Sequence, residues 1–417
     1  MTELMLHAII DDSRRSFLRE SLVWSGVVCG GAWNSFAAPG QVRKQTQRKL
    51  IVRQKSPLNA EPALADLVQS WITPTPAFYI RNHGSIPTIA AATPEGCVAA
   101  DPSRAATFRL KVEGLVRKPL ELSLRELAGR FPAAAAVATM TCAGNRRYEH
   151  SKVKKVGGVQ WREGAIGNAR WAGVRLSDVL KAAGLKPEAR HVWFDGLDEI
   201  DHKGKTIVFG GSIPLEKAMA DTKAMPGTLL CTQMNGKPLT PAHGAPLRTV
   251  VPGYIGARSV KWLGRIVVSD RPSPNHYVAD AYKIVTEGDK LELAEAGPIY
   301  TMPLNSVICA PSDGAKLKSG TVRVAGYALP AGRPDRTITR VEISTDNGRT
   351  FRPAKITSAR REYCWVLWSA DVPVSATTTQ LIVRCVDSAG HAQPRTVPWN
   401  MKGYMYNAWH RVPVSAK

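Results

Sequence analysis

The pattern of hydrophobic and polar positions changes character once along the body of the chain. Between Phe78 and Lys283, short alternating runs are interleaved with runs whose apolar residues recur at helical spacing. Beyond Pro298 only short alternating runs remain. We therefore expect a mixed α+β region over residues 76–297 and an all-β region over residues 298–417.

Within the first region the periodicity predicts particular elements. Phe108–Val116 alternates as a strand does, whereas Leu122–Phe131 and Leu176–Ala183 have the spacing of amphipathic helices. Ala133–Met140 is a run of small residues that leads into a Thr-Cys pair. No glycine-rich phosphate loop of the GxGxxG or GxxxxGK[ST] type occurs here, so a nucleotide-binding α/β domain is not indicated.

The second region consists of short runs rich in β-branched and aromatic residues. Asp346-Asn347-Gly348 lies between two of them and is a strong hairpin signal. Several strands at this spacing in about 120 residues predict an immunoglobulin-like β-sandwich. The runs are Val322–Ala328, Arg340–Ser344, Phe351–Ile356, Tyr363–Trp368 and Gln380–Val386.

The first residues have the order of an export signal. The paired arginines Arg14-Arg15 precede the apolar stretch Leu22–Ala38, which contains a small-x-small site at 35–37. This order predicts a twin-arginine signal peptide over residues 1–37, removed after export of the folded protein to the periplasm. The stretch is too short and too rich in glycine for a stable membrane span. Residues 38–75, polar and basic, are interpreted as an N-terminal arm.

Charge and cysteine content narrow the partners. With 56 Lys and Arg against 34 Asp and Glu, the formal charge is +22, which favours anionic partners. Basic residues are spread along the chain without a run of five, so a solvated basic surface is a better interpretation than nucleic-acid binding. Cys364 and Cys385 could bridge the sandwich. Folding in a reducing compartment before export instead favours free buried thiols.

Cys142 carries the most distinctive chemistry in the sequence. It is followed by Ala-Gly-Asn and then by Arg146 and Arg147, and thiolates are favoured beside cations. A thiolate is both a nucleophile and a soft metal ligand, so either Cys142 attacks a substrate or it anchors a metal. No Cys/His cluster elsewhere completes a metal site, so a metal would need ligands from a cofactor.

The segment around Cys142 resembles the cofactor-anchoring motif of the sulfite oxidase family of molybdenum enzymes. The resemblance extends over most of the chain from Phe78 to His410. Its further landmarks are residues 78–84, 164–171, 211–218, 234–239, 251–263 and 407–411. Several such segments in the family's order make the resemblance specific.

The resemblance implies that Cys142 binds the molybdenum of one molybdopterin per chain. It also implies that the phosphate and ring of the pterin are bound by Tyr79, Ile80, Arg81, Asn82, His83, Asp198, His243, Arg248, Ser259, Val260 and Lys261. Arginine, lysine and backbone N–H groups suit a phosphate, and an aspartate can accept hydrogen bonds from the pterin.

The same resemblance implies a pocket for a small oxyanion. Arg81 and Arg147 supply guanidinium groups, Trp161 an apolar wall, and Tyr282 the family's active-site tyrosine. At Lys402 the chain departs from the vertebrate pattern, which has arginine there. The positive charge is kept but the bidentate fork is lost, so selection of the anion at this position is open to question.

The function implied is oxidation of sulfite to sulfate. No c-type haem motif and no b-type haem domain are recognised in the sequence, so we expect an external cytochrome c as electron acceptor. The sandwich is expected to form a homodimer. Two alternatives remain: a molybdoenzyme of the same family that reduces another oxo substrate, nitrate or a sulfoxide, or a non-enzymatic exported protein that binds polyanions.

Overall fold

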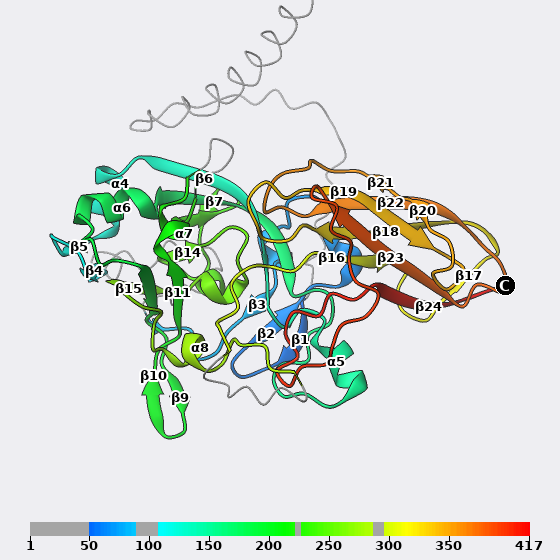
Figure 1. Cartoon of the computed structure of the whole chain (residues 1–417), viewed down its shortest axis with the longest axis horizontal. Helices are drawn as coiled ribbons and strands as arrows, with labels where there is room; N and C mark the ends of the chain where they lie inside the picture. Colours follow the sequence, from blue (N-terminus) through cyan, green and yellow to red (C-terminus); the bar gives the residue numbers. More distant parts are fainter. Residues whose placement is uncertain (1–49, 89–106, 222–226, 287–295) are drawn as a thin grey trace, which may run out of the picture. The chain divides into compact units, whose positions relative to one another are not determined.

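The computed structural model describes residues 50–88, 107–221, 227–286 and 296–417, which belong to one compact unit. The predicted signal peptide, the first part of the predicted arm, Cys29 and Cys97 lie outside the described residues. Figure 1 shows the helix-containing region and the all-strand region in order along the chain. The prediction of an α+β region followed by a sandwich is confirmed.

One mixed sheet of the first region takes its order from distant parts of the sequence. The strands lie in the order β11-β8-β15-β4-β5, with β15 parallel to β4 and antiparallel to β8. Its strands are β4 (Leu110–Gly114), β5 (Leu120–Leu122), β8 (His191–Gly196), β11 (Gly210–Pro214) and β15 (Leu263–Ser269). A short hairpin of β9 (Ile200–His202) and β10 (Lys205–Ile207) follows β8.

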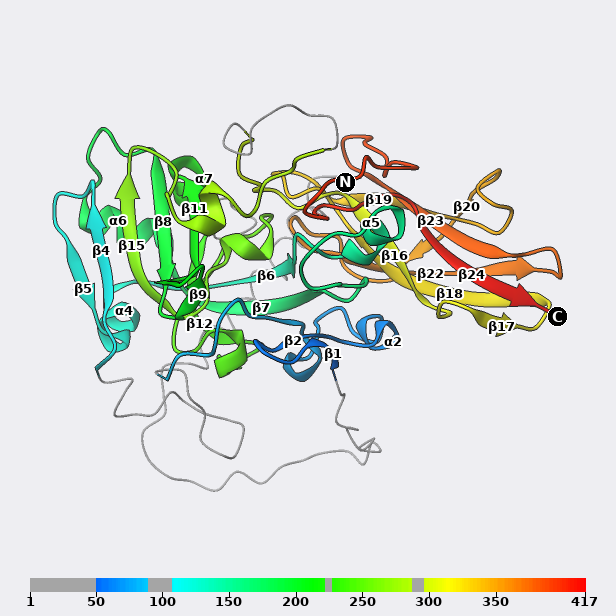
Figure 2. The ribbon, with the colours of Figure 1, turned by 90° about the horizontal axis from the view of Figure 1, so that it is seen from below.

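A second sheet is built on one long hairpin. The small-residue run before Cys142 is β6 (Ala133–Thr141), and it pairs along its whole length with β7 (Ile166–Arg175). Figure 2 shows this hairpin running from the region of the mixed sheet toward the sandwich. The sheet is completed by β12 (Leu229–Met234), β13 (Lys237–Pro238) and β14 (Arg248–Val250).

The two predicted helices exist, and their ends have local causes. Helix α4 (Leu124–Arg130) begins later than predicted because Ser123 and Glu126 form a reciprocal capping box. Helix α6 (Leu176–Ala183) ends at Gly184, whose φ of 69° suits glycine. The other α-helices of the described residues are α2 (Leu64–Leu67), α5 (Arg147–Val153), α7 (Leu215–Met219) and α8 (His276–Ala279).

The C-terminal region is a sandwich of two sheets, in the orders β16-β18-β22-β21 and β17-β24-β23-β19-β20. Their facing side chains, Val324, Trp368 and Val383 among them, form a separate apolar core. The strands are β16 (Asn305–Ala310), β17 (Ala315–Leu317), β18 (Gly320–Leu329), β19 (Ile338–Ser344), β20 (Arg352–Pro353), β21 (Lys355–Ile356), β22 (Val366–Val374), β23 (Gln380–Asp387) and β24 (His410–Ala416).

The start of one sandwich strand differs from the prediction, and the structure shows the state of the two sandwich cysteines. The run predicted from Tyr363 becomes a strand only at Val366, because Tyr363 has a φ of 56°. Cys364 and Cys385 are both buried and free, as the export argument predicted. The Cys364 thiol donates to the Val137 carbonyl of β6 at 3.1 Å, so it links the sandwich region to the sheet that contains β6.

The described part of the predicted arm is folded against both regions. Strands β1 (Ile51–Gln54) and β2 (Asn59–Glu61) form a small sheet with β3 (Ile80–Arg81). Farther along, the indoles of Trp71 and Trp365 each donate to the other's carbonyl at 3.0 Å. No helix among the described residues is long and apolar enough to cross a membrane.

Candidate active site

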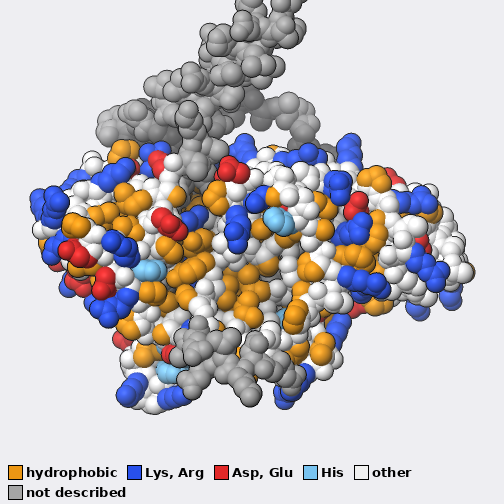
Figure 3. Space-filling view, in the orientation of Figure 1, with side chains coloured by type: hydrophobic (Ala, Val, Ile, Leu, Met, Phe, Trp, Pro, Cys, Tyr) orange, Lys and Arg blue, Asp and Glu red, His pale blue; other side chains and the backbone are white. Residues whose placement is uncertain are grey.

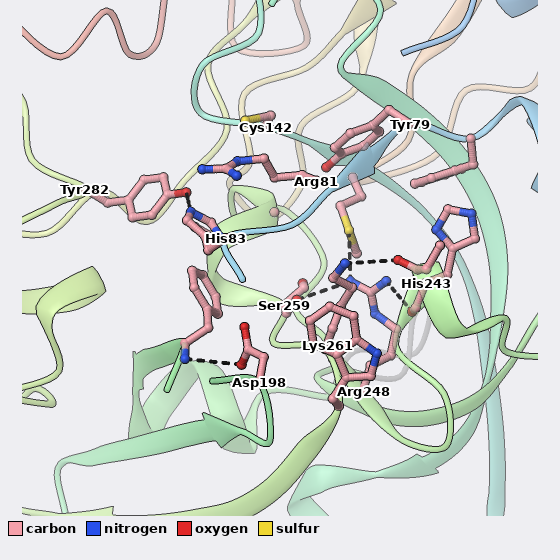
Figure 4. Close-up of a pocket in the computed structure, with 17 residues that line it drawn as sticks. Tyr79, Arg81, His83, Cys142, Asp198, His243, Arg248, Ser259, Lys261 and Tyr282 are labelled. Atoms are coloured by element: carbon pink, nitrogen blue, oxygen red, sulfur yellow. Dashed lines mark hydrogen bonds between the residues drawn. The ribbon is translucent and has the colours of Figure 1, made fainter. Parts of the chain in front are cut away.

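A pocket that is partly open to solvent collects side chains from many separate segments of the chain. Figure 4 shows its principal residues converging from β3 and from loops that follow β6, β8 and β14. Predicted residues that line it are Tyr79, Arg81, His83, Cys142, Asp198, His243, Arg248, Ser259, Lys261 and Tyr282. The fold thus brings together groups spread over 204 positions of the chain, from 79 to 282.

The loop after β6 presents Cys142 to this pocket. Its backbone N–H donates to the Ala165 carbonyl at 2.9 Å, and its sulfur accepts from the Gly144 N–H at 3.4 Å. The other cysteines in the described ranges are buried and do not line the pocket; burial raises the pKa of Cys231 and of Cys364 to about 12. Cys142 alone among these thiols faces a space that can hold a ligand.

Three cations of the pocket are bonded to neutral groups. Arg248 is buried and donates to the carbonyls of His243 and Ser259 at 2.9 and 3.2 Å. Lys261 donates to the Asn82 amide oxygen and to a carbonyl. Arg81 donates to the Asn59 amide oxygen at 3.1 Å. Within the described part of the chain, none of these three cations forms an ion pair with a carboxylate.

The accumulated positive charge changes the acid–base behaviour of the pocket. Burial lowers the pKa of Arg248 to about 10, and burial together with Arg248 lowers the pKa of Lys261 well below its usual range. Burial, Lys261 and Arg248 lower the pKa of His243 to about 3. Each of these shifts disfavours a positive charge, so an anion in the pocket would relieve an unfavourable field.

Asp198 is the acidic group of the pocket. Its carboxylate accepts from the Phe209 N–H at 3.2 Å, and burial raises its pKa. A single carboxyl of this kind does not balance the surrounding cations. It does provide a buried acceptor for N–H groups of a ligand.

Tyr282 and His83 form the polar pair at another side of the pocket. The Tyr282 hydroxyl and His83 Nε2 are 2.9 Å apart, and the His83 ring stacks on Phe209. Burial, then Arg81 and Lys261, lower the pKa of His83, whereas burial raises the pKa of Tyr282. Both groups are therefore neutral near pH 7, and they share one hydrogen bond without a net charge.

Three of the predicted pterin contacts lie outside the lining. Ile80 is half-buried in β3, and Val260 is buried in the core of the mixed sheet. Asn82 is buried, and its amide oxygen accepts a hydrogen bond from Lys261. It thereby holds in place a side chain that does line the pocket.

Three predicted oxyanion residues also lie behind the lining. The buried Arg147 donates from Nε to the Lys402 carbonyl at 3.2 Å and from Nη1 to the Val159 carbonyl at 3.0 Å. Lys402 thus meets Arg147 through its backbone. Trp161 is fully buried and packs edge-on against Tyr79, which lines the pocket.

Sequence reasoning missed several lining residues and one residue behind them. The lining includes Phe78, Met140, Phe209, Ala242, Gly256, Ala257 and Trp262. A Cβ at Gly256 would lie 2.7 Å from the Tyr79 hydroxyl, a constraint that no local pattern reveals. Behind the lining, Tyr404 stacks on Tyr282 at 5.1 Å between ring centroids. The sequence offered one sign of a role for Tyr404, namely that it lies two residues after Lys402.

Comparison with known proteins supports these observations. Residues 97–277 match the family described as "Oxidoreductase molybdopterin binding domain", and residues 296–417 match "Mo-co oxidoreductase dimerisation domain". Mitochondrial sulfite oxidase of Macaca fascicularis is 41% identical over 379 residues, which cover 88% of this chain and 65% of that protein. The chain thus spans about two thirds of the length of its mammalian relatives.

Other relatives widen the range of activities. Sulfite oxidase of Arabidopsis thaliana is 36% identical, with 87% of this chain and 93% of that protein covered. Nitrate reductase [NADPH] of Emericella nidulans is 34% identical, with coverage of 86% and 43%. The crystal structure of the sulfane dehydrogenase SoxCD from Paracoccus pantotrophus matches with a TM-score of 0.71 and 26% identity, covering 93% of each chain.

The Cys142 loop, the positively charged pocket and the two matched regions occur together in one fold. On these grounds, the chain belongs to the sulfite oxidase family of molybdopterin oxidoreductases.

Proposed function

We propose that this protein oxidises sulfite to sulfate at a molybdenum centre held by one molybdopterin, and passes the electrons to an external cytochrome c. The observation that carries the proposal is the Cys142 thiol facing a pocket whose cations lack carboxylate partners. The identity to the sulfite oxidases of animals and plants supports sulfite as the substrate.

The pocket residues fit a cofactor that has a phosphate, an N–H-rich ring and a soft metal. Arg248 and Lys261 would hold the phosphate, Asp198 would accept from the ring, and the Cys142 thiolate would bind the metal. When bound, molybdenum supplies a centre that takes up two electrons. Burial and neighbouring cations lower the pKa of Lys261 and of His243, so the pocket disfavours added positive charge, and this supports binding of an anion.

The chain's own side chains then bind and orient the substrate. Sulfite and water become sulfate with the release of two electrons and two protons. Arg81 lines the pocket and attracts the sulfite anion, and the Tyr282 hydroxyl can donate to one of its oxygens. Tyr282 and His83 share a 2.9 Å hydrogen bond between Oη and Nε2, which fixes the orientation of the phenol at the pocket.

The second candidate is reduction of another oxo substrate at the same site. The identity to a nitrate reductase favours nitrate, and the lysine at position 402 changes a cation of the anion pocket that the family resemblance implies. A protein that only binds polyanions is less well supported. Figure 3 shows Lys and Arg side chains scattered over the visible face, with no single continuous basic patch.

Steady-state assays of the molybdenum-loaded protein test the proposal. We expect sulfite-dependent reduction of ferricyanide and of cytochrome c, with far slower reduction of nitrate or of dimethyl sulfoxide. Failure to oxidise sulfite, together with rapid nitrate reduction, would establish the second candidate instead. Failure with every substrate by a protein that contains molybdenum would overturn both.

Export and assembly are further parts of the proposal. The Arg14-Arg15 pair in an apolar leader supports export by the twin-arginine pathway to the periplasm, and replacing both by lysine should leave the precursor in the cytoplasm. The match of residues 296–417 to a dimerisation domain supports a homodimer. Sedimentation equilibrium should give twice the chain mass, and a monomer at all concentrations would contradict this.

A further inference from the structure

Two consecutive arginines of the Cys142 loop each face a tyrosine of the C-terminal segment. The guanidinium carbon of Arg146 lies 4.9 Å from the ring centroid of Tyr406, and that of Arg147 lies 4.9 Å from the ring centroid of Tyr404. The two pairs have the same composition and the same spacing. They differ in surroundings, because Tyr404 also contacts a residue that lines the pocket, namely Tyr282.

Arg147 is confined to one position. A Cβ at Gly144, Gly158 or Gly403 would lie 2.7 Å from an atom of the Arg147 side chain. Its Nε and Nη1 atoms are also committed to backbone carbonyls. Since three glycines leave just enough room for this side chain, Arg147 offers Tyr404 a fixed cationic surface.

The rings continue from Arg147 to the pocket. Tyr404 and Tyr282 are nearly parallel, with 18° between their planes and 5.1 Å between their centroids. The guanidinium carbon of Arg258 lies 5.8 Å from the Tyr282 centroid, and Arg258 is anchored to the Ile299 carbonyl at 2.9 Å. Arg147, Tyr404, Tyr282 and Arg258 therefore make successive contacts between two anchored arginines, and we name this group the aromatic column.

The backbone holds Tyr404 in register with the metal-binding loop. Its N–H donates to the Asn400 side chain at 3.0 Å, and the same side chain donates to its carbonyl at 2.9 Å. The next residue, Met405, donates its N–H to the Ala143 carbonyl at 2.8 Å. The ring of Tyr404 is thus positioned by a segment bonded directly beside Cys142.

We propose that Tyr404 is a positioning residue, which holds the Tyr282 phenol in place over the pocket through the aromatic column. The proposal rests on the proposed function for its kinetic consequences. Tyr404 acts through Tyr282, whose hydroxyl meets His83, and it is given no contact with substrate. The ring is the part of Tyr404 that stacks on Tyr282, so we expect the ring alone to suffice for this role.

The test is a double-mutant cycle between Tyr404→Leu and Tyr282→Phe. Tyr404→Leu should lower kcat/KM for sulfite about tenfold, the scale of one aromatic stack plus one cation–π contact. Tyr404→Phe keeps the ring and should stay within about twofold of the wild type. If Tyr404 works through Tyr282, the double variant should be hardly worse than Tyr282→Phe alone.

Tyr406→Leu is the matched control. It removes an equivalent ring from the neighbouring Arg146, which does not line the pocket. Rates are normalised to molybdenum content, so incomplete loading does not count as lost activity. Tyr406→Leu should lower thermal stability while its effect on kcat/KM adds to that of Tyr282→Phe.

A cycle between Tyr404→Leu and Tyr282→Leu on the cofactor-free protein gives a readout that does not depend on activity, because Tyr282→Leu removes the ring that stacks on Tyr404. Urea midpoints should show coupling between positions 404 and 282, and none between 406 and 282. Additive effects at 404 and 282 in both experiments would overturn the proposal, as would an unchanged kcat/KM in Tyr404→Leu. The proposed function is tested separately, by sulfite oxidation with the wild-type protein, and neither result would bear on that assay.

Discussion

The molecule contains two clusters of buried or half-buried charge, and they are balanced in opposite ways. The junction cluster, between the catalytic region and the sandwich, consists of Arg146, Tyr148, Glu149, Glu163 and His410. In it Arg146 meets Glu149 at 2.6 Å, and His410 meets Glu163 at 3.2 Å. The pocket cluster consists of the cations Arg81, Arg248 and Lys261, with the neutral imidazoles of His83 and His243 beside them. Its cations meet carbonyl and amide oxygens instead of carboxylates.

The difference separates structural charge from charge that serves a ligand. A buried ion pair whose partners are both supplied by the chain is complete when the chain folds. In the pocket the cations outnumber the carboxyl of Asp198, and this excess positive charge raises the free energy of the folded state until an anion binds. The junction cluster thus stabilises the folded chain, whereas the pocket cluster serves to bind a ligand. The formal charge of +22 counts both kinds of cation together, so it indicated an anionic ligand but not where that ligand would bind.

The largest expected effect is at Cys142. Cys142→Ser should lower sulfite oxidation by roughly a thousandfold or more, because a serine hydroxyl is not ionised near pH 7 and is a poor soft-metal ligand. Circular dichroism should show an intact fold. Cys364→Ser is the control, since a hydroxyl there can keep the 3.1 Å hydrogen bond to Val137. Equal loss in both variants would point to a general effect of removing a buried thiol.

Removing a cation from each cluster should have opposite consequences. Arg146→Met in the junction cluster should destabilise the protein by about 3–5 kcal/mol, because it strands Glu149 at a buried interface. Arg248→Met in the pocket should cost the cofactor-free protein much less. Urea unfolding of both cofactor-free variants measures the contrast, and equal losses would remove the distinction between the clusters.

The junction cluster also predicts a pH dependence of stability. Burial alone would raise the pKa of Glu163, but His410 and Tyr148 hold it at about 2 against an ordinary 4.5. The folded protein thus binds this proton less readily than the unfolded chain. At a pH above the pKa of the unfolded chain, the Glu163 carboxylate contributes about 3 kcal/mol to the free energy of unfolding. This contribution is lost as the pH falls from about 5 toward 2.

Comparing the wild type with Glu163→Gln isolates this group from other titrations. As the pH falls from about 5 toward 2, the difference in unfolding free energy between the two proteins should become smaller. A difference that stays constant with pH would show that Glu163 is not ionised in the folded protein.

The smallest effect on stability is expected at Lys261. Lys261→Met removes a cation whose pKa is lowered by burial and by Arg248, so the cofactor-free protein should change by about 1 kcal/mol or less, in the stabilising direction. Molybdenum content should nevertheless fall, because a phosphate contact is lost. Lys237→Met, at an exposed position outside the pocket lining, is the control for loss of a cation. Full loading of Lys261→Met would contradict the role assigned to the pocket cluster.

The sequence predicted what depends on local pattern and on motifs. Periodicity located β4, α6 and several of the sandwich strands, and the family motifs supplied most of the pocket. Local pattern could not show that Arg147 would lie behind the lining, because its position depends on glycines at 144, 158 and 403. It could not show Tyr404 stacking on Tyr282 either, since 121 positions separate them along the chain.

Elemental analysis of the purified mature protein tests the central claim most directly. If the pocket cluster exists to bind an anionic molybdenum cofactor, protein from molybdenum-replete cells should contain molybdenum equimolar with the chain, and the variant Arg248→Met should have lost most of it. Protein that is fully folded and free of molybdenum, or an Arg248→Met variant that retains the wild-type content, would contradict the account.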